Sequence, residues 1–204
     1  TNVAQVNSVS QSKLLVEPIA GALGAEVGNV DLSNVNQTVI NEIRAAFTRY
    51  HVLVFRDQSL SPKAQKEFAK YFGPLETHPY IQGLQTDPEV VAIIKEPDET
   101  VNFGGGWHSD MSFLPAPPLG SVLYALEVPH SGGDTLFSNQ HSAYMELSDT
   151  MKEIVNDLTA VHSAASQYGR GGDSDKYKTE RGSMNLQVSD DAHQLVEHPV
   201  VRTH

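Results

Sequence analysis

The feature that most limits the fold of this chain is an alternation of strands and helix that stops early. Residues 14–20 and 25–32 resemble short strands, and residues 36–50 carry apolar side chains at the three- and four-residue steps of one helix face. The continuous apolar run over residues 51–55 then predicts a strand buried on both faces. Because the alternation does not persist past Phe55, we expect a β-rich α+β domain, not a doubly wound sheet.

Glycine, proline and polar clusters separate the remaining predicted elements. These elements are a helix over residues 61–73, strands over residues 89–95 and 120–128, a helix from residue 147 to residue 162 and a strand beginning at residue 198. We expect a loose tail over residues 1–13, a mobile loop over residues 97–106 and a flexible surface insertion over residues 163–192. The rest of residues 14–204 is expected to form a single domain.

Charge and cysteine content narrow the classes of function. The 204 residues include 14 Lys and Arg against 25 Asp and Glu, a net charge of −11, which opposes binding to nucleic acid or to an anionic membrane. There is no cysteine, so any metal must be held by carboxylates and the nine histidines. No apolar run approaches the roughly 18 residues of a membrane helix, and the first residues lack signal-peptide features. A cytoplasmic location is therefore expected.

The stretch Trp107-His108-Ser109-Asp110 carries a candidate metal site. In an extended strand His108 and Asp110 would point to the same face and could bind one metal together. One imidazole and one carboxylate suit Fe(II), and a second histidine would complete the facial triad of non-haem iron oxygenases. On these residues alone, a surface histidine beside a solvated aspartate remains the simpler interpretation, since nine histidines in an acidic chain produce such a tripeptide by chance.

A longer pattern surrounds this tripeptide. Residues 106–118 (GWHSDMSFLPAPP) are followed at a short interval by residues 129–137 (PHSGGDTLF). Together they resemble the taurine/2,4-dichlorophenoxyacetate dioxygenase family, the TauD/TfdA-like Fe(II)- and 2-oxoglutarate-dependent oxygenases. Other segments agree in the same order, namely residues 21–26 with 30–32, 54–58, 72–75 and 198–204. The resemblance covers about residues 14–204 and implies a double-stranded β-helix, a jelly-roll-like core with flanking helices.

The resemblance assigns roles to particular residues. His108 and Asp110 match the first two iron ligands, and Thr135 matches the residue whose hydroxyl helps to hold a 2-oxoglutarate carboxylate. His78 matches a pocket histidine that contacts the anionic group of taurine-like substrates. Gly104 stands where taurine enzymes often carry a substrate-contacting asparagine, and this counts against taurine itself.

Several of these residues also have structural interpretations. Trp107 and Phe113 would wall the substrate site, but core packing is the preferred interpretation for both of these large aromatic residues. For His78, a structural histidine with satisfied hydrogen bonds is as plausible as a contact to the substrate. Thr135 follows a Gly-Gly turn, where it could simply begin a strand, although the resemblance favours the functional role.

The chain departs from the family at its C-terminal end. The family's third iron ligand, a histidine, and the arginine that binds 2-oxoglutarate are expected beyond residue 204, together with the last strands of the core. None of the histidines downstream of Asp110 occupies the third-ligand motif; these are His130, His141, His162, His193, His198 and His204. We therefore expect the chain to be part of a longer protein.

The function implied by the resemblance is hydroxylation of a small, anionic organic substrate such as a sulfonate, a sulfate ester or an aryloxy acid. Fe(II), 2-oxoglutarate and O₂ would take part, with release of succinate and CO₂, and the loops 97–106 and 163–192 are candidate lids. The family also makes a homo-oligomer plausible. The alternative is a catalytically incomplete fragment that binds metal or ligand without oxygenase activity. A hydrolase is disfavoured, since the sequence contains neither His-Glu-x-x-His nor Gly-x-Ser-x-Gly.

Overall fold

A computed structural model of the chain describes residues 13–100, 102–174 and 183–203. Most of the predicted tail, residues 175–182 of the predicted insertion, and His204 lie outside the described residues. The chain divides into two compact units. Unit 1 comprises Thr1–Leu60 and Val128–Ala143, and unit 2 comprises Ser61–Glu127 and Tyr144–His204. The single domain expected over residues 14–204 stays a prediction.

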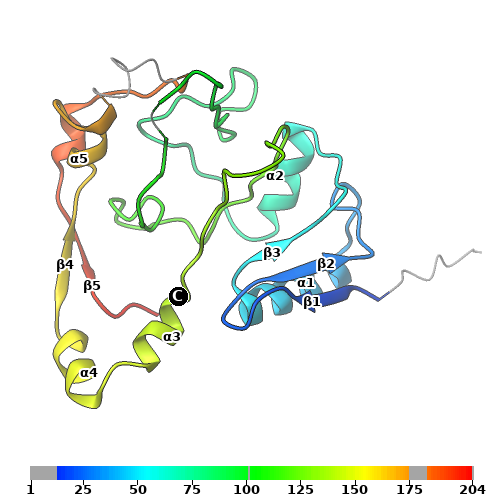
Figure 1. Cartoon of the computed structure of the whole chain (residues 1–204), viewed down its shortest axis with the longest axis horizontal. Coiled ribbons are helices and arrows are strands. Elements are labelled where there is room, and N and C mark those ends of the chain that lie inside the picture. Colours follow the sequence, from blue (N-terminus) through cyan, green and yellow to red (C-terminus); the bar gives the residue numbers. More distant parts are fainter. Residues whose placement is uncertain (1–12, 101, 175–182, 204) are drawn as a thin grey trace, which may run out of the picture. The chain divides into compact units, whose positions relative to one another are not determined.

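Unit 1 is built on a three-stranded sheet with the order β1-β2-β3. Strand β1 (Leu15–Pro18) pairs antiparallel with β2 (Ala25–Gly28), and β2 pairs parallel with β3 (Leu53–Val54). Helix α1 (Gln37–Tyr50) connects β2 to β3 and lies against one face of the sheet (Figure 1). The predicted strands of residues 14–32 are thus confirmed, in shorter form.

Helix α1 begins and ends where local chemistry dictates. The Asn36 side chain accepts a hydrogen bond from the Val39 amide, at 3.0 Å, and so satisfies a free N–H of the first turn. Ile40 and Ile43 lie on the buried face, and the positive φ of His51 (+64°) ends the helix. The predicted helix is confirmed. The prediction for residues 51–55 is wrong in part, because the strand is two residues long and only half-buried.

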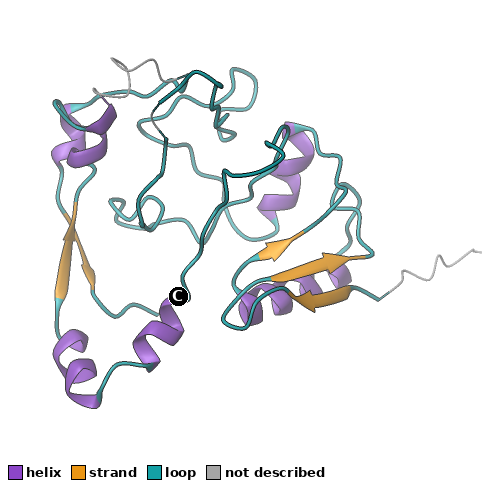
Figure 2. Ribbon diagram, viewed as in Figure 1, coloured by secondary structure: helices purple, strands orange, loops and turns teal. Residues whose placement is uncertain are grey.

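Unit 2 contains, within its described residues, α-helices, the 3₁₀ helix η1 and a two-stranded antiparallel sheet (Figure 2). Its elements are α2 (Pro62–Lys70), α4 (Asp149–Asn156), β4 (Thr159–His162), α5 (Ala165–Tyr168), η1 (Asp190–His193) and β5 (Val196–Pro199). Helix α3 (Gln140–Met145) falls where the ranges of the two units meet. The helix predicted from the Ser61-Pro62 start is confirmed, in shorter form. The strand predicted to begin at His198 is confirmed only in part, because it starts at Val196 and ends at Pro199.

The pairing of β4 with β5 corrects the predicted helix of residues 147–162. The helix ends at Asn156, and Thr159–His162 form a strand whose Ala160 lies opposite His198. Thr159 and Val161 are β-branched and favour a strand once a partner is available. The partner lies more than 30 residues downstream, so the local pattern alone did not reveal it.

The main core of unit 2 is built largely from the segment that we expected to be a flexible surface insertion. The buried residues of this cluster are Tyr80, Ile81, Ala164, Tyr168, Met184, Leu186 and Ala192. Leu186 is almost fully buried and forms an isolated β-bridge with Ile81. The described parts of residues 163–192 are therefore packed, and the lid role of this segment remains a prediction.

Two predicted strands, the first of them predicted to lie in the core, are not strands in the structure. Residues 89–95 and 120–128 form no ladder within the described part of the chain, and their apolar side chains are largely exposed, with Leu126 at 87%. An apolar run becomes a strand only when a partner takes its backbone hydrogen bonds. Neither run pairs with another strand among the described residues.

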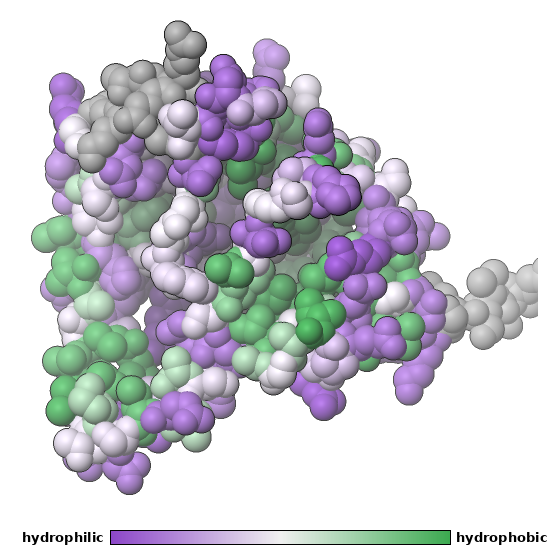
Figure 3. Space-filling model, viewed as in Figure 1, coloured by the Kyte–Doolittle hydropathy of each residue, from purple (hydrophilic) through white to green (hydrophobic). Residues whose placement is uncertain are grey.

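Helix α4 contributes no buried side chain to the core. Met151 and Ile154, with Leu158 just beyond the helix, are exposed, and apolar side chains gather at the surface over α4 and β4 (Figure 3). Among the described residues, no helix is both long enough and apolar enough to cross a membrane.

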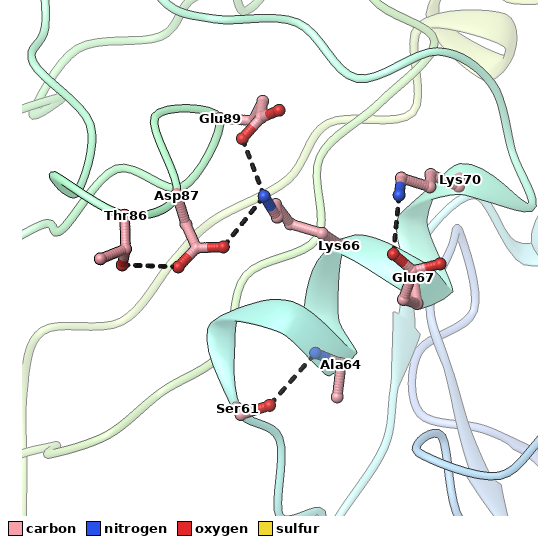
Figure 4. A network of polar contacts seen from close by, with 8 residues as sticks. All are labelled: Ser61, Ala64, Lys66, Glu67, Lys70, Thr86, Asp87 and Glu89. Atoms are coloured by element: carbon pink, nitrogen blue, oxygen red, sulfur yellow. Dashed lines mark hydrogen bonds and ion pairs between the residues drawn. The ribbon is translucent and has the colours of Figure 1, made fainter.

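Lys66 ties helix α2 to the turn that precedes residue 90 (Figure 4). Its Nζ lies 2.9 Å from an Asp87 carboxylate oxygen and 3.1 Å from a Glu89 oxygen, and all three side chains are largely shielded from solvent. The hydrogen bond from Lys66, followed by that from Thr86, lowers the pKa of Asp87. The pKa of Glu89 is lowered first by a backbone N–H and then by Lys66.

We predict that Lys66→Met lowers the free energy of unfolding at pH 7 and that this difference from wild type shrinks in acid. Both carboxyl pKa values are lower in the folded than in the unfolded chain. Their stabilisation is therefore complete above the unfolded values of about 4 and is lost as the pH falls through the folded values. Urea denaturation of wild type and Lys66→Met between pH 7 and pH 3 measures this difference in the free energy of unfolding.

Lys70→Met is the matched control, because Lys70 lies on the same helix and pairs with Glu67 at 2.7 Å while both side chains remain exposed. An exposed ion pair of this kind contributes little to the free energy of unfolding. If both variants lost the same free energy of unfolding at pH 7, the structural role of Lys66 would be contradicted.

Candidate functional site

The candidate metal ligands His108 and Asp110 converge in the structure. His108 Nε2 lies 3.0 Å from Asp110 Oδ1. The other ring nitrogen, Nδ1, lies 2.7 Å from the carbonyl oxygen of Gly106. Since a carbonyl oxygen only accepts, Nδ1 carries a proton and donates it. In the neutral ring, the Nε2 lone pair therefore faces the carboxylate oxygen.

This donor set fits a divalent cation. Two lone pairs at such a distance repel each other unless a proton or a metal ion lies between them. Metal–ligand bonds of about 2.1 Å at a right angle separate two ligand atoms by about 3.0 Å, and the observed separation is 3.0 Å. Donation of the other ring N–H to a backbone carbonyl is also the usual arrangement for a metal-binding histidine.

Further contacts orient the carboxylate. Ser121 Oγ donates to Asp110 Oδ2 over 3.2 Å, which leaves Oδ1 for the metal. His108 and Asp110 are 55% and 63% exposed, so the site is open to small molecules. No cluster of three or more metal-binding side chains occurs among the described residues. The part of the chain that the structure covers therefore offers two candidate ligands.

The backbone turns sharply directly after Asp110. Met111 has a positive φ of +49°, and the Leu114 amide donates to the Met111 carbonyl over 3.0 Å. A left-handed conformation at a residue other than glycine costs on the order of 1–3 kcal/mol and persists only where its surroundings impose it. The orientation of Asp110 thus depends on contacts that hold this turn.

The predicted substrate residues His78 and Phe113 lie together in an aromatic cluster. The His78 ring centroid lies 6.0 Å from Phe113, 6.2 Å from Tyr80 and 5.3 Å from Tyr168. The negative charge of Asp110 acts on both His78 and Tyr168. The structure therefore brings the two predicted substrate residues to one of the two predicted metal ligands.

The protonation of this cluster follows from its contacts. His78 Nδ1 accepts the Tyr80 amide over 3.1 Å, so the neutral ring carries its proton on Nε2, which lies 3.4 Å from the Tyr168 hydroxyl oxygen. Burial lowers the pKa of His78, and the charge of Asp110 opposes this effect. Burial and Asp110 together raise the pKa of Tyr168 to about 12. Both groups are neutral hydrogen-bond donors at pH 7.

The other predicted site residues have different outcomes. Gly104 has a φ of +71°, and a Cβ atom there would lie 3.7 Å from His108 Cε1, so this position borders the candidate metal ligand His108. Trp107 is 73% exposed, and its predicted core packing is wrong. Phe113 does pack against the buried cluster. Thr135 is exposed and belongs to unit 1, and its role remains a prediction.

Sequence reasoning missed two contributors. Tyr168 lies in the segment expected to be a flexible insertion, and Ser121 lies at the start of an expected strand. No local signal marks either residue, because each reaches the site only through tertiary packing.

Comparison with known families identifies the family of the chain. The sequence profile of the family described as "Taurine catabolism dioxygenase TauD, TfdA family" matches residues 15–204. The chain belongs to the TauD/TfdA family. The resemblance predicted from residues 106–118 and 129–137 is confirmed.

Three relatives within the TauD/TfdA family show its range. The chain is 33% identical to an alpha-ketoglutarate-dependent sulfate ester dioxygenase of Pseudomonas putida, covering 100% of the chain and 67% of that protein. It is 30% identical to an alkylsulfatase of Acinetobacter baylyi, and the match covers 94% of this chain and 60% of that protein. It is 32% identical to an alpha-ketoglutarate-dependent 2,4-dichlorophenoxyacetate dioxygenase of Cupriavidus pinatubonensis, and the match covers 94% of this chain and 69% of that protein. The chain thus spans about two thirds of their length or less.

Solved structures of the TauD/TfdA type share the fold. A taurine dioxygenase from Burkholderia xenovorans superimposes with a TM-score of 0.70 at 28% identity, covering 94% of this chain and 59% of that one. The structure named AAD-2, solved with Mn(II) and N-oxalylglycine, gives a TM-score of 0.62 at 24% identity, covering 94% and 65%. At that identity the second likeness concerns the fold alone.

We predict that His78 of the metal-free protein titrates below the ordinary histidine pKa of about 6.5 and that Phe113→Ala raises this pKa, because water then reaches the ring. NMR titration of the ring protons measures both values. Since the folded pKa lies below the unfolded one, the neutral ring favours folding, and this contribution is lost as the pH falls through the folded value.

Phe72→Ala is the control, since Phe72 packs edge-on against Phe68 of α2. It should leave the pKa of His78 unchanged. An unchanged value in Phe113→Ala as well would show that burial by Phe113 does not set the pKa of His78.

Proposed function

We propose that the protein containing this chain is a non-haem Fe(II)- and 2-oxoglutarate-dependent dioxygenase. It hydroxylates a small anionic organic substrate and releases succinate and CO₂. The observation that carries the proposal is the placement of His108 Nε2 at 3.0 Å from Asp110 Oδ1, with Nδ1 donating to the Gly106 carbonyl. Membership in the TauD/TfdA family supports the same reaction class.

Each group of the chain has a defined task in this proposal. His108 and Asp110 hold Fe(II), which when bound supplies the oxygen chemistry together with 2-oxoglutarate. Ser121 and the Gly106 carbonyl orient these two ligands. Thr135 is the proposed contact to 2-oxoglutarate. The third ligand and the arginine are proposed to follow residue 204, together with the remaining strands of a jelly-roll core.

The aromatic cluster is the proposed substrate site. His78 Nε2–H and the Tyr168 hydroxyl are two neutral donors 3.4 Å apart, and Phe113 supplies an apolar wall. Such donors can hold an anionic oxygen of a sulfate, sulfonate or carboxylate group. The metal ion offsets the nearby negative charge of Asp110. Gly104 leaves open the space beside His108 that an asparagine would occupy, which argues for a substrate other than taurine.

A metal- or ligand-binding protein without oxygenase activity is the second candidate. It is favoured by the presence of only two metal ligands among the described residues. It differs from the first candidate in one measurable respect, since it forms no succinate from 2-oxoglutarate.

We predict that anaerobic addition of Fe(II) and 2-oxoglutarate produces a visible charge-transfer band and that air with substrate then yields succinate. His108→Ala should abolish both. The loss of activity in His108→Ala should exceed the roughly 10–100-fold loss that follows removal of a residue that only hydrogen-bonds to a metal ligand. His141→Ala, at an exposed histidine of α3, is the control. Unchanged iron affinity in His108→Ala would contradict the assigned site, and a band without succinate would favour the second candidate.

We predict that Tyr168→Phe raises the KM for the anionic substrate by about 10–100-fold, because a hydrogen bond to a charged group is lost. Succinate formation with a linear alkyl sulfate, an alkanesulfonate, an aryloxyacetate and taurine measures the effect and the preference. Tyr144→Phe is the control, since its hydroxyl donates to Asn156 at 2.9 Å. Equal KM values for the two variants would remove Tyr168 from the substrate site.

A further inference from the structure

Two histidines lie on one face of the β4–β5 ribbon. In the antiparallel register Ala160 lies opposite His198, and His162 lies two residues further along β4, on the same face as Ala160. The rings of His162 and His198 accordingly meet edge to face, with centroids 5.2 Å apart. This diagonal pair is a product of strand pairing between distant segments.

Both histidines contact the turn that follows Asp110. His198 Nε2 lies 3.0 Å from the carbonyl oxygen of Ser112 and 3.0 Å from that of Leu114. His162 Nδ1 lies 3.1 Å from the Ser112 hydroxyl. The same short segment is therefore held through its backbone and through a side chain.

The chemistry of the His198 contact defines its protonation. Two carbonyl oxygens only accept, so Nε2 must carry a proton and donate to both. His198 is 8% exposed, which shields this shared hydrogen bond from water. A buried donor of this kind fixes the two carbonyls more firmly than solvent does.

We propose that His198, supported by His162, is a positioning residue for the metal site. It acts through the turn that begins at Met111, whose left-handed conformation must be imposed by its surroundings. By binding the carbonyls of Ser112 and Leu114, His198 holds this turn closed and so sets the direction of the Asp110 carboxylate. The inference rests on the proposed function of His108 and Asp110 as metal ligands.

The test compares His198→Gln with His198→Asn in the full protein. The glutamine amide nitrogen reaches about the position of Nε2 and can donate to both carbonyls, whereas the shorter asparagine falls short of them. Both variants are polar and retain β5. Mn(II) binding, followed by the electron paramagnetic resonance of the free ion, should weaken about tenfold in His198→Asn and remain near wild type in His198→Gln.

Hydrogen exchange supplies a second measurement that needs no metal. The Leu114 amide, which donates to the Met111 carbonyl, should exchange faster in His198→Asn than in His198→Gln. Equal Mn(II) affinity in wild type and both variants, or an equal loss in both, would overturn the positioning role while the proposed function stood. If His108→Ala also binds Mn(II) as wild type does, the proposed function fails and the inference with it.

Discussion

The antiparallel pairing of β4 with β5 is the constraint on which the organisation around the site depends. It joins residues 159–162 to residues 196–199, so that described parts of the intervening segment lie near residues 80 and 81. Tyr168 and Leu186 from that segment then complete the core against Tyr80 and Ile81. The same pairing brings His198 to the turn beside Asp110. One short ladder thus connects the core, the aromatic cluster and the candidate metal ligands.

The site combines a negative charge with neutral donors. Asp110 opposes the burial effect on the pKa of His78 and adds to the burial effect on the pKa of Tyr168. A cation bound by His108 and Asp110 would offset this charge and make the adjoining donors suitable for an anionic substrate. In the proposed function, metal binding and anion binding would therefore be coupled physically, although they use different side chains.

Local sequence rules predicted the elements whose determinants lie within one turn of the chain. The Asn36 cap and the apolar face of Ile40 and Ile43 sufficed for α1, and the Ser61-Pro62 start sufficed for α2. The same rules failed for residues 89–95 and 120–128, because an apolar run does not specify a partner. The local rules also predicted that the helix continues through residues 159–162, because they contain no information about the pairing of β4 with β5.

The sequence by itself determined the family and named the candidate metal ligands. His108 and Asp110 stand in an ordered pattern of motifs, and the absence of cysteine restricts the metal ligands to histidine and carboxylate. Only the tertiary structure decided that Tyr168 faces His78 and that His198 holds the turn after Asp110. These contacts join residues more than 80 positions apart, and side-chain packing, which local propensity does not encode, selects them.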